Sequence, residues 1–422
     1  MTKTTQYKNI PIGTIPNDWE VKKLGEVGEI SSGGTPSTTV EEYWNGDINW
    51  CTPTDISALS SEYLDDTTAK ITEAGLKNSS AKILPPNSII VCTRATIGKA
   101  AINSQPMSTN QGFKNIIPVG INHKFLYYKI LAEENGLKRI ANGSTFLEVS
   151  KSDFENYHIS LPPLPEQQKI ADVLSTWDKA IQETDAIIKK LEDRNKALAF
   201  SLLTGKKRVK NKENSKFHKT NLGSKYPIDW EIKTVKTIFK ERKEKSNDQS
   251  KYPLFSLTIE KGLTEKTDRY ERSFLLKDQE SNEYKLIYPN DILFNPMNLR
   301  FGAIAKSNID EIVSVSAYYN SIYKTDENVN LDYHTNLFKT DLFINLYDRI
   351  AIGSLLEKKR VHLSNFLELE IPFPSLKEQN AIAEILNTAN QEVKQYQQKL
   401  EALKLQKKGL MQQLLTGKVR TV

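Results

Sequence analysis

The sequence has very few cysteines and no long hydrophobic run. Its 422 residues include only two cysteines, Cys51 and Cys92. Two cysteines exclude a disulfide framework and a cysteine-rich metal site, and we expect both to be small buried residues. No apolar run approaches the ~20 residues of a membrane-spanning helix, and the opening MTKTTQYKNIPIG lacks the apolar centre of a signal peptide. We therefore expect a cytoplasmic protein with no membrane partner.

Motifs for catalysis and cofactor binding are missing as well. Asn295-Pro296-Met297 is similar to the Asn-Pro-Pro-aromatic loop of amino-methyltransferases, but it lacks the second proline and is predicted to be a turn. Glu-x-Lys at 20–22 and 231–233 is similar to half of a nuclease metal site, but each copy follows a repeated tryptophan and is predicted to pack as a strand. Thr-Gly-Lys at 204–206 and 416–418 lacks the upstream glycine of a phosphate-binding loop. The chain is therefore predicted to be non-catalytic, with no metal and no cofactor of its own.

The net charge of +6 is unevenly distributed along the chain. Residues 1–160 have 15 basic and 17 acidic residues, and residues 213–370 have 24 of each, so these blocks are nearly neutral. The excess lies in 161–212, with 11 basic against 7 acidic residues, and in 371–422, with 8 against 4. A basic excess of this size is compatible with nucleic acid as a partner, and equally with an ordinary mildly basic protein.

The pentapeptide Leu-Leu-Thr-Gly-Lys occurs at 202–206 and again 212 positions later, at 414–418. The flanking residues repeat at the same offset, as Glu166-Gln167 and Glu378-Gln379 show, which indicates an internal duplication. Each half begins with Asp-Trp-Glu and continues through strand-like runs that follow Pro-Asn turns at 86–87 and 289–290. Each half then ends in a proline-containing segment, LPPLPEQ or IPFPSLKEQ, after which a helix can start.

A heptad pattern follows each of these segments. Apolar residues recur with alternating spacings of four and three, which predicts two long helices, each about 57 Å long at 1.5 Å per residue. Glycines Gly205 and Gly417 are predicted to end them, and Asn195 and Lys407 interrupt the seams at one equivalent place. The predicted seam residues are Ile170, Leu174, Trp177, Ile181, Ile188, Leu191, Leu198 and Leu202 in the first helix, and Ile382, Leu386, Val393, Leu400, Leu403, Leu410 and Leu414 in the second.

A single amphipathic helix cannot bury such a seam, so we expect the two helices to pack on each other. The alternative is that each packs on its own globular block or on a second molecule. Between the halves, residues 206–216 are polar and basic. They are predicted to be a solvated linker, and the alternative is a tail that contacts phosphates.

Polar side chains suited to nucleic acid gather in both globular blocks. The first block has a Gly/Ser/Thr loop at 31–39, whose hydroxyl and amide groups suit phosphate oxygens, and later basic and amide side chains that suit base edges. For each residue the alternative is a turn or cap. The candidate DNA-binding residues are Thr35, Ser37, Thr52, Thr54, Arg94, Lys99, Asn110, Gln111 and Lys114, with positional counterparts Ser256, Thr258, Arg300, Tyr318, Tyr319 and Asn320 in the second block.

This order of parts resembles the specificity subunits of Type I restriction-modification systems, the subunits that recognise DNA. The resemblance covers the whole chain: the Asp-Trp-Glu segments, GGTPSTTVEEYWNGDINWCTPTDI, RATIGKAAI, STNQGFKNIIP, LPPLPEQQKIA and the helices that close in LLTGK. The second block departs from it, because it has no GGTPST loop and SVSAYYN replaces STNQG. Different half-site sequences would require such divergence.

The resemblance implies an α+β chain with two similar mixed α/β target-recognition domains, separated by two long helices that form an antiparallel coiled coil, with pseudo-twofold symmetry. We expect the domains at 1–160 and 213–370, the first helix with its basic linker at 161–212, and the second helix at 371–422. Each domain would read one half of a bipartite site, and the helices would set the spacer.

The resemblance also implies the partners. These are double-stranded DNA, two methyltransferase subunits that dock on the helices, and restriction/translocase subunits, with S-adenosylmethionine, ATP and Mg²⁺ belonging to those partner subunits. Two alternatives are the recognition subunit of another methyltransferase-linked restriction system and a coiled-coil scaffold without a DNA role.

Overall fold

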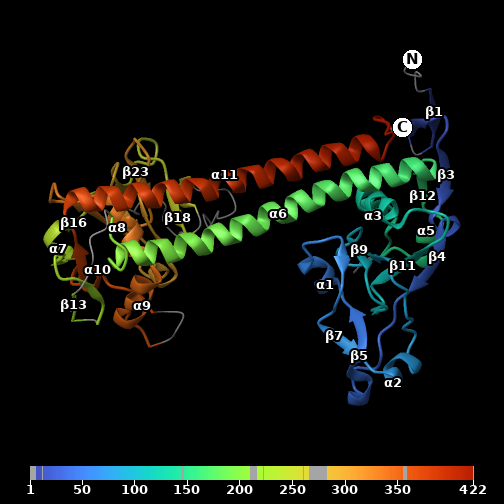
Figure 1. Ribbon diagram of the computed structural model, residues 1–422, viewed down its shortest axis with the longest axis horizontal. Coiled ribbons are helices and arrows are strands. Elements are labelled where there is room, and N and C mark those ends of the chain that lie inside the picture. The colour runs from blue at the N-terminus through green and yellow to red at the C-terminus, as the bar shows by residue number, and fades with distance from the viewer. Residues whose placement is uncertain are drawn as a thin grey trace. The chain divides into compact units, whose positions relative to one another are not determined.

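The computed structural model describes residues 6–11, 13–143, 147–209, 216–221, 223–259, 261–265, 283–354 and 359–421. The chain forms two compact units, Met1–Ile187 with Tyr396–Val422, and Ile188–Gln395. Two long helices, α6 (Leu164–Leu203) and α11 (Leu376–Leu414), each contribute one part to either unit (Figure 1). Most of the predicted basic linker, residues 210–215, lies outside the described residues.

The first unit contains a five-stranded sheet of order β4-β11-β8-β9-β6 and a three-stranded sheet of order β10-β5-β7. Its central strand β8 is apolar throughout and fully buried, as its Ile-Ile-Val-Cys sequence requires. The elements are β1 (Tyr7–Ile10), β2 (Gly13–Pro16), β3 (Glu20–Lys23), η1 (Leu24–Glu26), β4 (Gly28–Ser32), η2 (Glu41–Tyr43), β5 (Trp44–Cys51), α1 (Pro53–Ala58), β6 (Tyr63–Leu64), β7 (Ala69–Ile71), α2 (Glu73–Lys77), β8 (Ile89–Cys92), β9 (Ala100–Asn103), β10 (Ser108–Thr109), β11 (Phe113–Pro118), α3 (His123–Ala132), α4 (Glu134–Ile140), α5 (Lys151–Glu155) and β12 (His158–Leu161).

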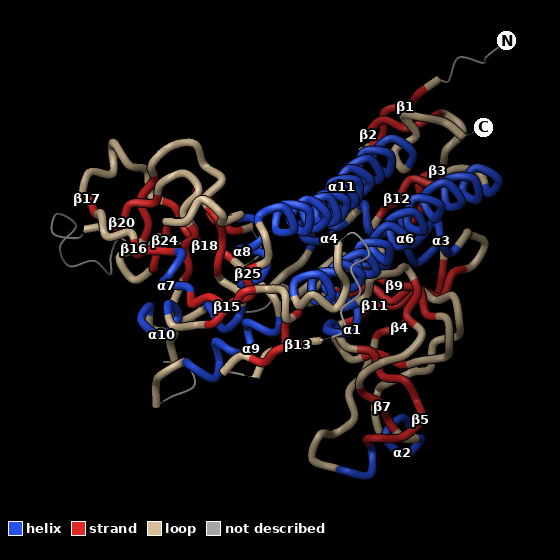
Figure 2. The backbone as a smooth tube through the Cα atoms, turned by 60° about the vertical axis from the view of Figure 1, so that its left-hand side comes forward, coloured by secondary structure: helices blue, strands red, loops and turns tan. Residues whose placement is uncertain are grey.

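The second unit repeats this plan with a four-stranded sheet of order β16-β24-β21-β22. Strands β15 and β25 pair as β3 and β12 do in the first unit, and β13 and β14 pair as β1 and β2 do. The elements are β13 (Phe217–Lys219), β14 (Lys225–Pro227), β15 (Glu231–Thr234), α7 (Val235–Ile238), β16 (Phe239–Glu241), β17 (Lys245–Ser246), β18 (Phe255–Thr258), β19 (Gly262–Glu265), β20 (Tyr284–Ile287), β21 (Ile292–Phe294), η5 (Leu299–Phe301), β22 (Ile304–Lys306), β23 (Val313–Val315), β24 (Asn320–Lys324), α8 (Leu331–Phe338), α9 (Asp341–Ile350), α10 (Leu363–Leu367) and β25 (Glu370–Phe373). Figure 2 colours the helices blue and the strands red.

The long helices run antiparallel in both units. In the first unit, Leu410 and Leu414 of α11 share a core with Ile170 and Leu174 near the start of α6. In the second unit, Ile382 and Leu386 near the start of α11 share a core with Leu198 and Leu202 of α6. Early residues of one helix thus meet late residues of the other, and Figures 1 and 2 both show the helices side by side. All the predicted seam residues are buried or half-buried.

The two polar seam residues have different partners. In the second unit, Asn195 Nδ2 donates to the carbonyl oxygen of Ala389 at 2.8 Å. In the first unit, the Lys407 ammonium pairs with the Asp178 carboxylate, which also accepts from the Tyr128 hydroxyl at 2.7 Å. Both polar groups inside the seam are therefore satisfied, as buried polar groups must be.

Each Leu-Leu-Thr-Gly-Lys segment ends a long helix and leads to an arginine that binds the adjoining unit. Gly205 and Gly417 adopt left-handed φ values of 68° and 71°, which favour glycine. Three residues beyond Gly417, Arg420 donates to Glu166 at 2.8 and 2.9 Å and to Asp18 at 2.9 and 2.6 Å. Glu166 also accepts from Trp19 Nε1 at 3.0 Å. We call Asp18, Trp19, Glu166 and Arg420 the first clasp.

The second unit contains the same arrangement, which we call the second clasp. Arg208 donates to Glu378 at 2.7 and 2.9 Å and to Asp229 at two oxygens, both at 2.8 Å. Trp230 Nε1 donates to Glu378 at 3.2 Å. The Arg208 side chain is only 2% exposed, so the expectation of a solvated linker is wrong at this residue. The pentapeptide recurs because each helix end needs the same turn to bring an arginine to an Asp-Trp pair.

Candidate nucleic-acid interface

Four segments of the first unit meet around Gly112. The Asn110 backbone N–H donates to the carbonyl oxygen of Cys51 at 3.0 Å, and the Thr35 hydroxyl donates to Gln111 Oε1. A Cβ atom at Gly112 would lie 3.8 Å from Arg94 Cβ and 4.0 Å from the side chain of Pro53. The loops that follow β4, β5, β8 and β10 therefore converge, and each carries residues predicted to bind DNA.

The glycines of the Gly-Gly-Thr-Pro loop are required by the protein's own packing. A Cβ atom at Gly33 would lie 1.8 Å from the Asn110 carbonyl oxygen, and one at Gly34 would lie 2.3 Å from Ala81 N. The Gly34 amide donates to Thr109 O at 2.9 Å. These glycines allow two protein segments to approach. The Gly34 amide, one of the amides that the sequence offers to a phosphate, is therefore bound within the protein.

Glu148 joins two of the predicted residues. Its carboxylate accepts from Arg94 Nε at 3.0 Å and from Lys114 Nζ at 3.2 Å. Burial raises the pKa of Glu148, but the hydrogen bonds from Arg94 and Lys114 outweigh burial and hold this pKa below its usual range. The carboxylate is therefore charged at neutral pH and fixes both cations. The Arg94 side chain remains 42% exposed, whereas that of Lys114 is 7% exposed.

The other predicted residues of the first unit lie around this cluster. Thr52 is the N-cap residue before α1, and its hydroxyl and backbone N–H both donate to Asp55 Oδ2. Thr54 and Ser37 are exposed, and the Ser37 hydroxyl bonds that of Thr39 at 2.9 Å. The exposed Lys99 reaches Ser57 Oγ at 3.5 Å. Contacts to DNA from all of these residues stay predictions.

In the second unit the predicted residues are less concentrated. Ser256 and Thr258 lie on β18, while Tyr318 and Tyr319 precede β24, where Asn320 is the first residue. Tyr318 is 85% exposed, and Tyr319 packs against the core beneath β23. Asn320 Oδ1 accepts from Lys285 Nζ at 3.2 Å.

Arg300 is held inside the second unit. It lies in η5, and its Nε donates to Asp348 of α9 at 2.7 Å. Its side chain is 8% exposed. The sequence matched Arg300 with Arg94, but Arg94 lies in a loop beside Glu148, so the two arginines have different surroundings.

The geometry gives two copies of one fold, each with a polar cluster in its loops. A family model described as the Type I restriction modification DNA specificity domain matches residues 16–193 and again residues 227–405. The chain belongs to this specificity-domain family.

Curated relatives support the membership. The MjaIX specificity subunit of a Type I restriction enzyme from Methanocaldococcus jannaschii is 38% identical over 245 residues, which cover 56% of this chain and 55% of that protein. The MjaVIII specificity subunit from the same organism is 26% identical over 444 residues, which cover 99% of this chain and 97% of that protein. The first alignment thus spans just over half of its relative, and the second spans nearly all of both.

A solved structure of this family has the same fold. The crystal structure of a Type I restriction-modification S subunit from M. genitalium matches with a TM-score of 0.55 at 14% identity, and the match covers 94% of this chain and 96% of that chain. Two specificity domains with a long helix pair are therefore the architecture of this chain.

The structure places two of the motifs that were compared with catalytic sites, and both cysteines. Residues 296 and 297 form a turn, and Trp19 and Trp230 are buried beside β3 and β15, as predicted. Cys51 and Cys92 are free and buried, and burial raises the pKa of the Cys92 thiol to about 11. Within the described ranges, no cluster of His, Cys, Asp or Glu could hold a metal ion. Among the same residues, no helix has the length and apolar character to cross a membrane.

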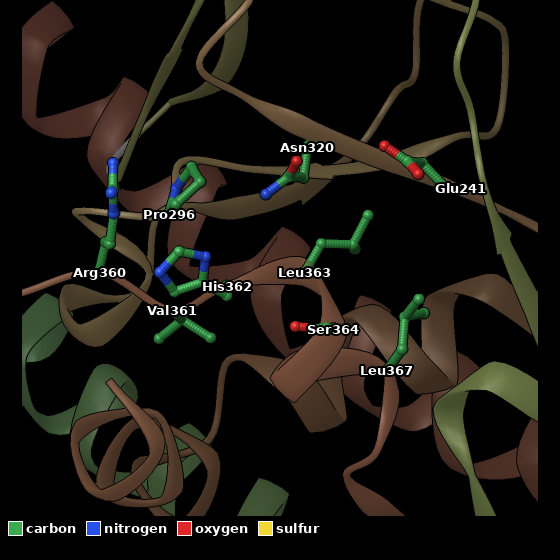
Figure 3. A pocket seen from close by; sticks show the side chains of 9 residues that line it. All are labelled: Glu241, Pro296, Asn320, Arg360, Val361, His362, Leu363, Ser364 and Leu367. Carbon is green, nitrogen blue, oxygen red and sulfur yellow. The ribbon is translucent and has the colours of Figure 1, made fainter. Parts of the chain in front are cut away.

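Three residues of the polar clusters were not predicted from the sequence, namely Glu148, Arg360 and His362. Glu148 was missed because an acidic residue is not an obvious ligand for DNA. Arg360 and His362 line a cavity of about 570 Å³ next to Asn320 (Figure 3). A signal was present, because Ala-x-Gly-Ser occurs at 141–144 and at 351–354, shortly before Glu148 and Arg360.

Proposed function

We propose that the chain reads double-stranded DNA as the specificity subunit of a Type I restriction-modification complex. In this proposal, the domains at 1–160 and 213–370 each read one half of a bipartite site. The observation that carries the proposal is the double match to the specificity-domain family, with one match covering each half of the chain. Two diverged copies of one reader suit a site whose two halves differ.

We propose that α6 and α11 set the spacer between the half-sites. Each helix is continuous and contributes to both units, so its length is fixed by hydrogen bonds rather than by a loop. One heptad inserted after Ile187 in α6 and one after Gln395 in α11 would add about 10 Å to both helices. We expect the tolerated spacer to lengthen by about three base pairs at roughly 3.4 Å each, with both half-sites unchanged. Altered half-sites would contradict this role.

We propose that two methyltransferase subunits dock on a repeated outward face of the helices. Asp172, Val173 and Thr176 of α6 are exposed, and their counterparts 212 positions later, Glu384, Ile385 and Thr388 of α11, are exposed too. Because these exposed residues do not pack between the two helices, packing does not explain why their chemistry matches. Two equivalent faces that bind two copies of one partner would explain it. S-adenosylmethionine, ATP and Mg²⁺ would be used by the partner subunits, which include the restriction/translocase subunits.

The docking face can be tested by the number of bound subunits. Val173→Asp and Ile385→Asp place a charge in each proposed face, and we expect either variant alone to retain one methyltransferase subunit and the pair to retain none. Native mass spectrometry of the reconstituted complex measures this stoichiometry. Leu405→Asp is the matched control, because Leu405 is 72% exposed but its counterpart in α6 is Asp193. Two bound subunits in the double variant would contradict the proposed face.

The function itself is tested by sequencing methylated bases in cells that express the chain with its methyltransferase partner. We expect methylation at one bipartite sequence, which disappears when the gene is removed. Methylation without sequence preference, or none that depends on this chain, would favour a scaffold without a DNA role.

A further inference from the structure

The two domains build the same backbone frame around their polar clusters. In the first domain, Thr93 O accepts from the Val149 backbone N–H at 3.0 Å. In the second, Pro296 O accepts from the Val361 backbone N–H at 2.9 Å. The residue before each valine forms an antiparallel bridge, Glu148 with Asn142 and Arg360 with Ile352. Glu148 and Arg360 therefore occupy the same position in the two domains.

Strand register extends this correspondence to a second position. The turn before β8 has Asn87 at φ 67°, and the turn before β21 has Asn290 at φ 69°, which fixes how the two strands align. With that alignment Val91 matches Phe294. Val91 pairs with Lys114 of β11, and Phe294 pairs with Asn320 of β24. Lys114 and Asn320 are thus counterparts on the strand that faces the frame.

The side chains at these two positions differ in charge although the backbone is the same. The first domain has Lys114 and Glu148, which form an ion pair together with Arg94. The second has Asn320 and Arg360, and the counterpart of Arg94 is Met297. The two domains keep the same backbone hydrogen bonds, yet Glu in the first is Arg in the second and Lys is Asn. Such a difference is expected where selection acts on what the side chains bind rather than on stability.

In the second domain the frame opens into the cavity of about 570 Å³. Asn320 lines it from β24, Glu241 from β16, Arg360 and His362 from the segment that leads into α10, and Ser364 from α10 itself (Figure 3). Arg360, His362 and Ser364 are exposed. Lys285 Nζ donates to Asn320 Oδ1, and Figure 3 shows the Asn320 nitrogen on the side of the cavity that faces His362.

We propose that this frame holds the residues that discriminate bases, with Arg94 reading the first half-site and Asn320 and Arg360 reading the second. The inference rests on the proposed DNA recognition and assigns residues to it. Arginine reads guanine through O6 and N7, and asparagine reads adenine through N6 and N7. We assign no base to Glu148, because both its oxygens already accept from Arg94 and Lys114. It is a positioning residue that holds the Arg94 guanidinium in one orientation. Asn320 Oδ1 accepts from Lys285, which leaves it a second lone pair and the Nδ2 donor for a base.

The test uses the complete complex of this chain with its methyltransferase subunits, and methylated bases are sequenced genome-wide. Arg360→Ala should relax one position of the second half-site, so that methylation of sites with another base there rises roughly 5- to 150-fold relative to the wild type. The first half-site should stay unchanged. Arg94→Ala should have the reverse effect, with the second half-site unchanged.

Two further variants separate base reading from charge. Arg360→Lys keeps the positive charge but loses the planar fork, and we expect it to relax the same position as Arg360→Ala. Lys324→Ala is the matched control, because Lys324 lies on β24 with Asn320 but pairs with the exposed Glu327. It should leave the methylated sequence unchanged.

Each outcome decides the inference. A uniform fall in methylation of the original sites by Arg360→Ala, without relaxation, would show a phosphate contact and overturn it. Unchanged specificity in Arg360→Ala and Arg94→Ala would overturn it as well, while DNA recognition by the chain would stand. The proposed function would fail separately, if the wild-type complex itself methylated no defined sequence.

Discussion

The contacts of the first clasp predict that Arg420 stabilises the first unit. Arg420→Met removes both bidentate pairs and preserves the length of the apolar stem. Asp18 is 52% exposed, so loss of its pair costs at most about 1 kcal/mol. Glu166 is 0% exposed, and among the described residues it would keep the Trp19 N–H and a long contact from Thr421 N at 3.5 Å. Leaving a buried carboxylate without its cation costs roughly 3 kcal/mol or more.

Hydrogen exchange measured by mass spectrometry suits this prediction, because it reports each unit separately and needs no two-state assumption. A loss of about 3 kcal/mol corresponds to roughly 100-fold faster exchange of the slowest amides. We expect this acceleration in β8 and β11 of the first unit, with β21 and β24 of the second unit unchanged. Arg208→Met, which opens the second clasp, should produce the opposite pattern.

A double variant without the buried charge tests whether the unpaired Glu166 carboxylate causes the loss of stability. Glu166→Gln removes the buried charge and can still accept from Trp19, so Arg420→Met with Glu166→Gln should recover most of the lost protection. Acceleration below about 5-fold in Arg420→Met would refute the reasoning, since it would place the value of the pair near that of a surface ion pair. Equal acceleration in both units would refute the assignment of one clasp to each unit.

Three other predictions concern pH, the helix ends and DNA affinity. Burial lowers the pKa of His334 to about 4 from the usual 6.5. Between these pH values the imidazole binds a proton in the unfolded chain but not in the folded chain. The free energy of unfolding should therefore fall by roughly 3 kcal/mol as pH drops from 6.5 to 4. Urea unfolding of His334→Leu should show a weaker pH dependence than the wild type over this range. Gly417→Ala should destabilise the first unit by more than about 1 kcal/mol, because the φ of Gly417 is 71° and the new Cβ would lie 2.5 Å from Pro16. Gly409 lies in the interior of α11, where a new Cβ meets no atom within 4 Å. Gly409→Ala should therefore stabilise the same unit by up to about 1 kcal/mol, and thermal unfolding measures both changes. The isolated chain should bind DNA weakly in a gel-shift assay, because its two blocks are nearly neutral, and equally tight binding with and without the methyltransferase would contradict this.

Local regularities made the helices predictable. The seam and the stops at Gly205 and Gly417 depend on residues a few positions apart, and the structure has helices of 40 and 39 residues where the heptads indicated them. The clasps were not predicted, because Arg208 meets Glu378 across 170 positions and Arg420 meets Glu166 across 254. Their residues all belong to the repeat, so a search for charged residues kept in both halves would have found them.

The polar clusters were only partly predictable for a different reason. Arg94 and Lys114 were chosen for their own chemistry, but what holds them is Glu148, which no motif marks. The short sequence match between the two halves pairs Arg94 with Arg300. The backbone hydrogen bonds instead make Met297 the counterpart of Arg94, and Arg360 the counterpart of Glu148. A single-residue difference in the loop before Gly98 and Gly302 shifts the alignment, and only the hydrogen-bond register reveals it.

The division of the first unit has a consequence for biosynthesis. The second unit is contiguous, from Ile188 to Gln395, whereas the first consists of residues up to 187 and residues from 396 onward. A ribosome therefore synthesises all of the second unit before it makes the part of α11, from Tyr396 onward, that belongs to the first. The first unit, although translated earliest, can therefore add Leu414 and Leu415 to its core only at the end of synthesis, and we expect chaperones to protect it for longer than the second unit.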